Sequence, residues 1–161
     1  LAQSEAGLLP LAQDKIELLP FVKAVVEERA GRIREAGLTV DLRGDKSAGR
    51  TTGDARRLTR AIGHLLDNAI AATPRGGHIL VDLDRGKKHL RLSISDNGPG
   101  MDAAALARAL GGLKVSSDGK TVERRQGIGL PLARQLIEAH GGTLEIHSEP
   151  GQGTVAVVEL P

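Results

Sequence analysis

Two short stretches of the sequence carry closely spaced glycines, which make the backbone flexible there. Asp96 is followed by two glycines that flank a proline, in the order DNGPG, and Gly127 and Gly129 stand at the predicted start of a helix. Glycines let a backbone approach an anion closely, and the exposed amides and dipole of a helix N-terminus favour negative charge. The second pair therefore suits a phosphate group, although a flexible hinge before a helix gives the same pattern.

A third stretch places Asn68 inside HLLDNAIAATP, an otherwise favourable helix. Asn is a mediocre helix former, and His64 lies four residues earlier on the same helical face. An amide oxygen and an imidazole side by side could hold a hydrated Mg²⁺ and its phosphates, because magnesium takes few protein ligands. The alternative is that Asn68 is a satisfied core amide and that His64 and Asp67 lie at the surface.

The residues around the glycines leave further alternatives open. Arg124 and Arg125 precede the second glycine pair and could clamp phosphoryl oxygens in bidentate fashion, but a solvated basic pair is equally compatible with the sequence. The Asn-Gly pair after Asp96 would ordinarily indicate a hairpin turn. No partner strand follows it, and Asp102 is instead expected to cap a helix over residues 103–110.

Composition limits what kind of protein this is. The 161 residues fit one domain, and with one Phe and no Trp or Tyr the core must be aliphatic. The net charge of +2 is small and its basic residues are dispersed, which argues against a nucleic-acid partner. The absence of cysteine excludes disulfides and fits a reducing cytosol. We see no apolar run of about 18 residues and no signal peptide, and we expect a cytoplasmic domain.

Hydrophobic spacing and chain breakers predict the elements that must position these residues. Helices are expected over 20–37, 55–73 and 128–140, besides the short one at 103–110, and Asp54 is expected to cap the helix over 55–73. Strands are expected over 38–45, 78–85, 88–95, 143–149 and 154–160, with an edge strand within 8–18. The fold class is therefore α+β: a two-layer α/β sandwich whose mixed, mostly antiparallel sheet of about five strands is covered on one face by three helices. Residues 101–127, irregular apart from one helix, are expected to form a lid.

In this order the motifs resemble the N, G1 and G2 boxes of the catalytic ATP-binding domain of sensor histidine kinases, in the GHKL superfamily. The stretches are HLLDNAIAATPRGG, SDNGPGM and GIGLPLARQLIEAHGGTLEIHSEPGQGTVAVVELP. The resemblance covers residues 8–161 and implies the GHKL ATPase fold. Residues 1–7 resemble the end of the dimerisation helix that precedes this domain in kinases.

The resemblance also implies roles for the bound nucleotide. Asp96 would accept a hydrogen bond from the exocyclic amine of adenine, with Thr154 supporting it through water. Gly98 and Gly100 would let the backbone pass close to the base and hinge the lid. Asn68 would ligate the Mg²⁺ that bridges the triphosphate. The remaining residues assigned to the phosphate side or to the lid are His64, Met101, Lys114, Arg124, Arg125, Gly127, Gly129 and the amide of Leu130.

The same resemblance implies a reaction. Gyrase-type relatives place a glutamate four residues before the magnesium Asn to activate water, and His64 occupies that position here. The γ-phosphoryl group of ATP is therefore expected to pass to a histidine on a separate dimerisation domain absent from this chain, and then to a response regulator. We expect no direct membrane contact from this domain, whether or not the parent protein is membrane-anchored.

Departures from the family pattern favour one other function, and a further one stays open. Ala71 and Ala72 replace a Lys and an aromatic residue that many kinases carry, and LARALGGLKVSS lacks the usual Phe. Lys114, Arg124 or Arg125 could supply the missing cation. A degenerate kinase that acts as a regulatory protein-binding module, with weak or no ATP binding, is one alternative. An anti-sigma-factor serine kinase of the same superfamily is another, which the HGG tail and the helix remnant at Leu1 disfavour.

Overall fold

A five-stranded sheet forms the centre of the computed structural model, which describes residues 10–44, 49–86, 89–111, 114–115, 121–122 and 129–161. Its strand order is β2-β4-β5-β9-β8. The strands are β2 (Thr39–Arg43), β4 (His78–Arg85), β5 (Leu90–Asp96), β9 (Gly153–Leu160) and β8 (Thr143–Glu149). β2 and β4 run parallel, whereas the other neighbouring pairs run antiparallel. This confirms the predicted mixed, mostly antiparallel sheet.

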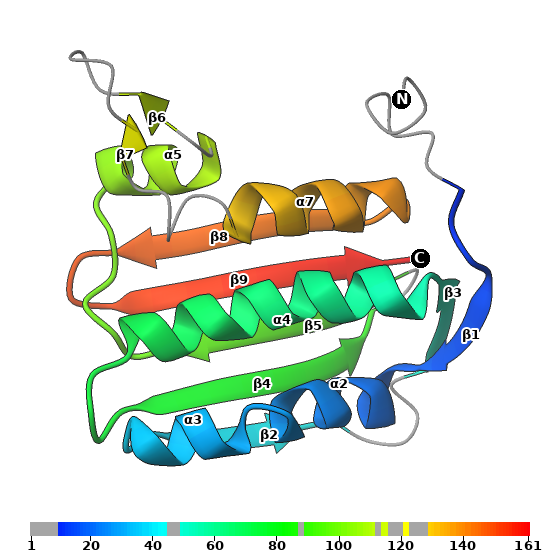
Figure 1. Cartoon of the computed structure of the whole chain (residues 1–161), viewed down its shortest axis with the longest axis horizontal. Coiled ribbons are helices and arrows are strands. Elements are labelled where there is room, and N and C mark those ends of the chain that lie inside the picture. Colours follow the sequence, from blue (N-terminus) through cyan, green and yellow to red (C-terminus); the bar gives the residue numbers. More distant parts are fainter. Residues whose placement is uncertain (1–9, 45–48, 87–88, 112–113, 116–120, 123–128) are drawn as a thin grey trace.

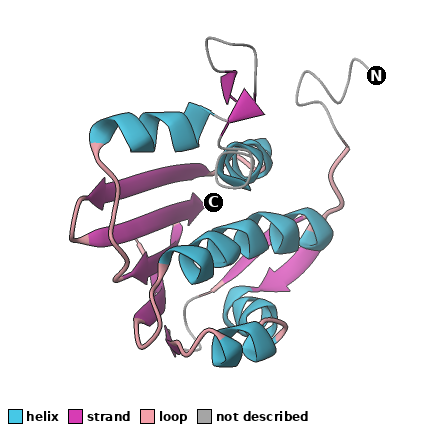
Figure 2. Ribbon diagram, turned by 60° about the vertical axis from the view of Figure 1, so that its left-hand side comes forward, coloured by secondary structure: helices cyan, strands magenta, loops and turns pink. Residues whose placement is uncertain are grey.

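Helices cover one face of this sheet (Figures 1 and 2). α4 (Ala55–Ala72) crosses its middle, α7 (Gly129–Ala139) lies on one side of α4, and α2 (Leu18–Glu27) and α3 (Ala30–Glu35) lie on the other. The apolar stripe of α4 is buried, including Leu58, Ile62 and Leu66, which are each about 1% exposed or less. Burial of aliphatic side chains between helices and sheet is the main source of stability in such a layer. The α+β two-layer sandwich is thus confirmed.

Both predicted N-caps are present. The side chain of Asp54 accepts a hydrogen bond from the amide of Arg57 at the start of α4. The side chain of Asp102 accepts one from the amide of Ala105 at the start of α5 (Ala103–Gly111). Each cap satisfies an amide that has no partner within its helix. The chain after Asp96 therefore leads into a helix and not into a hairpin.

The helix predicted over 20–37 is two helices, which corrects the sequence analysis. α2 ends at Glu27 and α3 begins at Ala30, with Arg29 between them at φ −103° and ψ 8°. The guanidinium of Arg29 turns back to the carbonyl of Val25 and across to Asp67 of α4. Hydrophobic spacing does not reveal this break, because the ion pair that accompanies it joins residues distant in sequence.

The structure adds two small sheets. β1 (Asp14–Glu17), within the expected edge strand, pairs antiparallel with β3 (Arg50–Gly53), a strand that the sequence analysis did not predict. β6 (Lys114–Val115) and β7 (Thr121–Val122) also pair antiparallel, so the predicted lid contains strand structure besides its helix. Residues 1–7, expected to end a helix, lie outside the described residues. Among the described helices, none is both long and apolar enough to cross a membrane.

Candidate functional site

A cavity of about 300 Å³ lies between α4, the sheet and the segment that leads from β5 into α5. Five of its lining residues come from α4, and others come from β5, β8, β9, α5 and α7. The lining side chains are apolar or absent, with the exceptions of Asn68, Asp96 and Thr154. An apolar cavity of this size with a few convergent polar groups is the usual form of a small-molecule site.

Asp96 ends β5 at the floor of the cavity. Its Oδ1 accepts hydrogen bonds from the amides of Gly98 (2.9 Å) and Thr154 (3.3 Å), and no described residue donates to Oδ2. Burial raises the pKa of Asp96, and the two amide hydrogen bonds offset this only in part. An ionised carboxylate can accept about four hydrogen bonds. Asp96 therefore has both the capacity and an energetic reason to accept a further donor from a ligand.

Gly98 and Gly100 shape the chain that follows. A Cβ atom on Gly98 would collide with the carbonyl oxygen of Ala72, at the end of α4. A Cβ on Gly100, where φ is +73°, would collide with the carbonyl oxygen of Glu149 in β8. Both glycines are thus required for close packing of this segment between α4 and the β8–β9 turn. Their expected approach to a base and their role as a hinge remain predictions.

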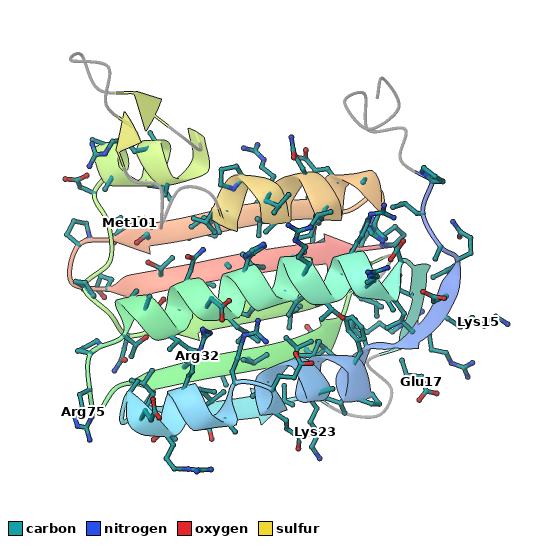
Figure 3. All side chains as sticks on the ribbon, in the orientation of Figure 1. Lys15, Glu17, Lys23, Arg32, Arg75 and Met101 are labelled. Atoms are coloured by element: carbon teal, nitrogen blue, oxygen red, sulfur yellow. The ribbon has the colours of Figure 1, made fainter. Side chains whose placement is uncertain are left out.

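Met101 and Thr154 meet at a residue that the sequence analysis missed. The amide of Met101 donates to Oγ of Ser148 (2.8 Å), which lies 2.8 Å from Oγ1 of Thr154. Met101 is labelled in Figure 3, at the end of the sheet where β8 and β9 join. Thr154 also lies opposite Asp96 in the β5–β9 register. Ser148 belongs to the quoted C-terminal motif, but no periodicity singles it out, because its importance comes from pairing across strands.

Asn68 lines the cavity from α4, and its Nδ2 is buried without a hydrogen-bond partner among the described residues. A buried amide without a partner costs free energy, and such an atom is uncommon in a folded protein. The alternative of a satisfied core amide therefore does not describe Asn68. Its side chain is available to a ligand in the cavity.

His64 and Asp67 are not simple surface residues either. Nε2 of His64 is buried without a partner among the described residues, and His64 is not one of the cavity-lining residues. Burial, reinforced by the charge of Arg60, lowers the pKa of His64 and so favours the uncharged ring. Asp67 pairs instead with Arg29 and Arg32 of the α2–α3 region. Burial works to raise the pKa of Asp67, but these two arginines lower it below its ordinary value.

The phosphate side of the predicted site is described only in part. Gly129 is the first residue of α7 and Leu130 the second; Leu130 is buried and lines the cavity. The first amides of a helix have no intrahelical acceptors, so they can meet an anion. Lys114 begins β6. Arg124, Arg125 and Gly127 lie outside the described residues.

Comparison with known proteins identifies relatives of the whole chain. Residues 53–161 match the family model described as histidine kinase-, DNA gyrase B- and HSP90-like ATPase. Sensor protein DivL of Caulobacter vibrioides is 29% identical over the whole chain, which spans 20% of that protein. An uncharacterized sensor-like histidine kinase of Rhizobium meliloti is 32% identical, and the chain spans 31% of it. The chain thus spans between a fifth and a third of the length of these relatives.

Solved structures show the same fold. Histidine kinase AdeS of Acinetobacter baumannii superposes with a TM-score of 0.78 at 20% identity, covering 99% of this chain and 72% of that one. A nucleotide-free catalytic domain of histidine kinase ThkA gives a TM-score of 0.76 at 21% identity, covering 92% of this chain and 95% of that one. At 20% and 21% identity, these two structures show only that the fold is shared. The cavity described above lies within that fold.

Proposed function

The chain belongs to the family of histidine kinase-, DNA gyrase B- and HSP90-like ATPases, as an ATP-binding domain of the histidine kinase type, and from this we propose how its cavity works. We propose that it binds ATP with Mg²⁺ and passes the γ-phosphoryl group to a histidine on a dimerisation domain, from which a response regulator receives it. The observation that carries the proposal is the half-buried carboxylate of Asp96 in an apolar cavity that Asn68 also lines. We further propose a cytoplasmic location.

Asp96 would select the base. The exocyclic amine of adenine carries two hydrogens, and Oδ2 of Asp96 receives none from the described residues. Guanine presents a carbonyl oxygen at the same position. Two hydrogen-bond acceptors would then face each other, and the carboxylate would lack a donor. Sites built on such hydrogen bonds discriminate by about 10⁴-fold. Asp96 would therefore decide between purines more strongly than the apolar walls.

The residues at the other end of the cavity fit a magnesium triphosphate. Asn68 lines the cavity, and its Nδ2 has no partner among the described residues. Mg²⁺ is commonly held by one or two protein oxygens, water and phosphates, so Oδ1 of Asn68 would be the ligand. Bound with the triphosphate, Mg²⁺ would neutralise charge on the transferred phosphoryl group. The amides of Gly129 and Leu130, at the start of α7, would meet the phosphates.

Transfer, not hydrolysis, is the reaction that we propose. A ring nitrogen of the acceptor histidine forms a bond to the γ-phosphorus while the bond from that phosphorus to the bridging oxygen breaks, and ADP leaves with the electron pair. Burial favours the neutral form of His64, but the ring does not line the cavity where a water would be activated. The chain would thus position the nucleotide, and the partner domain would supply the nucleophile.

Calorimetric titration with ATP and Mg²⁺ tests the base-binding part. We expect saturable binding, and Asp96→Asn should weaken it about 10- to 100-fold, because asparagine has an NH2 donor in place of one of the two acceptor oxygens. Asp82→Asn is the matched control, since Asp82 is also half-buried in a strand but does not line the cavity. Equal affinity in wild type and Asp96→Asn would refute the assigned role of Asp96.

The metal part has its own test. Wild-type protein should bind ATP more tightly with Mg²⁺ than with EDTA, and Asn68→Ala should reduce this difference because the protein ligand is lost. Asp96→Asn serves as the comparison: it should weaken binding while keeping the advantage of Mg²⁺. An undiminished advantage of Mg²⁺ in Asn68→Ala would show that Asn68 is not a ligand.

A regulatory protein-binding module is the second candidate. Ala71 and Ala72 are exposed where they line the cavity, so neither supplies a cation or an aromatic wall to the ligand. Absence of saturable ATP binding at millimolar concentration would favour this function. Binding followed by labelling of a dimerisation domain from radioactive ATP would favour the kinase.

A further inference from the structure

Ser148 connects two parts of the cavity wall without lining the cavity itself. It lies near the end of β8, and its Oγ is within hydrogen-bond distance of the amide of Met101 (2.8 Å), the carbonyl oxygen of Gly153 (3.0 Å) and Oγ1 of Thr154 (2.8 Å). Thr154 lines the cavity and donates its amide to Asp96. A single hydroxyl thus joins the beginning of the segment before α5 to the residue that faces Asp96.

The number of donors and acceptors fixes the direction of these hydrogen bonds. A serine hydroxyl has one hydrogen to donate and two lone pairs that accept. The amide of Met101 can only donate and the carbonyl of Gly153 can only accept, so Ser148 uses one lone pair and its hydrogen on them. The lone pair that remains can accept from the hydroxyl of Thr154. This arrangement satisfies all three neighbours, including a carbonyl of the buried Gly153.

The opposite direction is worse. If Ser148 donated to Thr154, the carbonyl of Gly153 would lose the hydrogen bond from this hydroxyl, and one lone pair of Ser148 would stay unused. The group would then contain one hydrogen bond fewer, which makes this direction the less favourable one. The hydroxyl hydrogen of Thr154 therefore points to Ser148, and the lone pairs of Thr154 are left for the cavity.

We propose that Ser148 is a positioning residue for base selection: by holding the hydroxyl hydrogen of Thr154, it makes the Asp96–Thr154 end of the cavity accept hydrogen bonds and donate none. The proposal rests on the proposed function, that this end reads adenine. Asp96 and Thr154 lie opposite each other in the β5–β9 register, so the two acceptors face the same edge of the base. An amine, directly or through a water, meets two acceptors there, whereas the carbonyl oxygen of guanine meets no donor.

Titration of the wild-type chain and its variants with ATP and with GTP tests the proposal. Ser148→Ala frees the hydroxyl of Thr154 to donate, and we expect the preference for ATP over GTP to fall about tenfold, the usual effect of one hydrogen bond. Ser148→Thr retains Oγ and should retain the preference. Ser148→Cys, whose thiol is a weaker donor and acceptor, should lower it and gives a second variant should alanine impair folding.

Control variants distinguish a positioning role of Ser148 from a general loosening of β8. Ser93→Ala removes another half-buried strand serine, on the face that the helices leave open, and should change nothing. With Thr154→Val, where no hydroxyl remains to be directed, Ser148→Ala should have no further effect on the preference. Equal weakening of ATP and GTP by Ser148→Ala would overturn the positioning role alone. Absence of saturable ATP binding to the wild-type chain would overturn the proposed function and this inference together.

Discussion

Two side-chain nitrogens one turn apart on α4, Nε2 of His64 and Nδ2 of Asn68, are buried without a hydrogen-bond partner among the described residues. The free-energy cost of leaving Nδ2 of Asn68 unpaired can be offset when a ligand in the cavity accepts a hydrogen bond from it. His64 does not line that cavity, and its burial and the charge of Arg60 oppose protonation. Protonation of His64 at low pH should therefore destabilise the folded state.

The pH dependence of stability should show this. The lowered pKa of His64 means that the unfolded chain binds this proton more readily, so the free energy of unfolding falls as pH drops below the ordinary histidine pKa. We expect His64→Asn to lose less stability than wild type between about pH 7 and pH 5, as measured by urea denaturation. In this pH range the histidine of the unfolded chain, with its ordinary pKa of about 6.5, takes up the proton. Parallel curves for the two proteins would contradict the assignment, because the other histidines are common to both.

Among the elements, α4 is joined to the α2–α3 pair by a contact that depends on one glycine. Arg29 reaches over Gly63 to Asp67, with its Nε 2.8 Å from Oδ1 of Asp67, and its Nη1 bonds the carbonyl of Val25 (3.1 Å). A Cβ placed on Gly63 would lie 2.5 Å from Nη2 of Arg29. Glycine in a helix interior is normally unfavourable, so its presence here follows from the space that Arg29 takes.

A double-mutant cycle measures this dependence. Gly63→Ala should raise the free energy of unfolding little or not at all in the wild-type background, because the guanidinium of Arg29, which pairs with Asp67, must shift to make room for the Cβ atom. In an Arg29→Ala background the same change should raise it by about 0.5–1 kcal/mol, the ordinary helix preference of alanine over glycine. Urea denaturation of the four proteins gives both values. An equal effect in the two backgrounds would mean that Arg29 and Gly63 do not interact.

For the whole molecule, one point joins segments from the beginning, middle and end of the chain. Asp54 accepts hydrogen bonds from the amide of Ala12 (3.0 Å) and from Arg57, and its own amide donates to Nε2 of His140 (3.0 Å) at the end of α7. The hydrogen bond from Ala12 is the largest single cause that lowers the pKa of Asp54 against the effect of burial, and Arg57 lowers it further. Nδ1 of His140 meets the carbonyl of Leu136 (2.7 Å), so both ring nitrogens are used.

His140→Ala should therefore lower the free energy of unfolding by about 1–3 kcal/mol, because the amide of Asp54 at the start of α4 loses its acceptor. His147→Ala is the control, since His147 is exposed and only its surface contact with Glu145 would be lost. Chemical denaturation followed by circular dichroism measures both. An equally small loss for the two variants would show that the link between α4 and α7 contributes little.

Much of the architecture was predictable because its causes are local. The stripe of Leu58, Ile62 and Leu66, the cap at Asp54 and the alternation along β4 and β5 are set by residues near one another in sequence, which decide helix, strand and buried face. Asp96, at a strand end before two glycines, was singled out by the motif that it begins, and the structure places it in the lining of the cavity; its role there stays a prediction. The order of the motifs indicated the family that the comparisons show.

What depends on contacts between distant residues was settled in three dimensions alone. The break at Arg29 accompanies its pairing with Asp67, and β3 exists by pairing with β1. That the buried Nδ2 of Asn68 has no partner among the described residues depends on the side chains packed around it. Ser148 meets Gly153 and Thr154 when β8 pairs with β9, and it meets Met101 only when this hairpin packs against the residues after β5. Local sequence determines which elements form and which faces are apolar, because propensity and periodicity act over a few residues. The direction of a hydrogen bond depends on every neighbour of the atom, and packing brings those neighbours together.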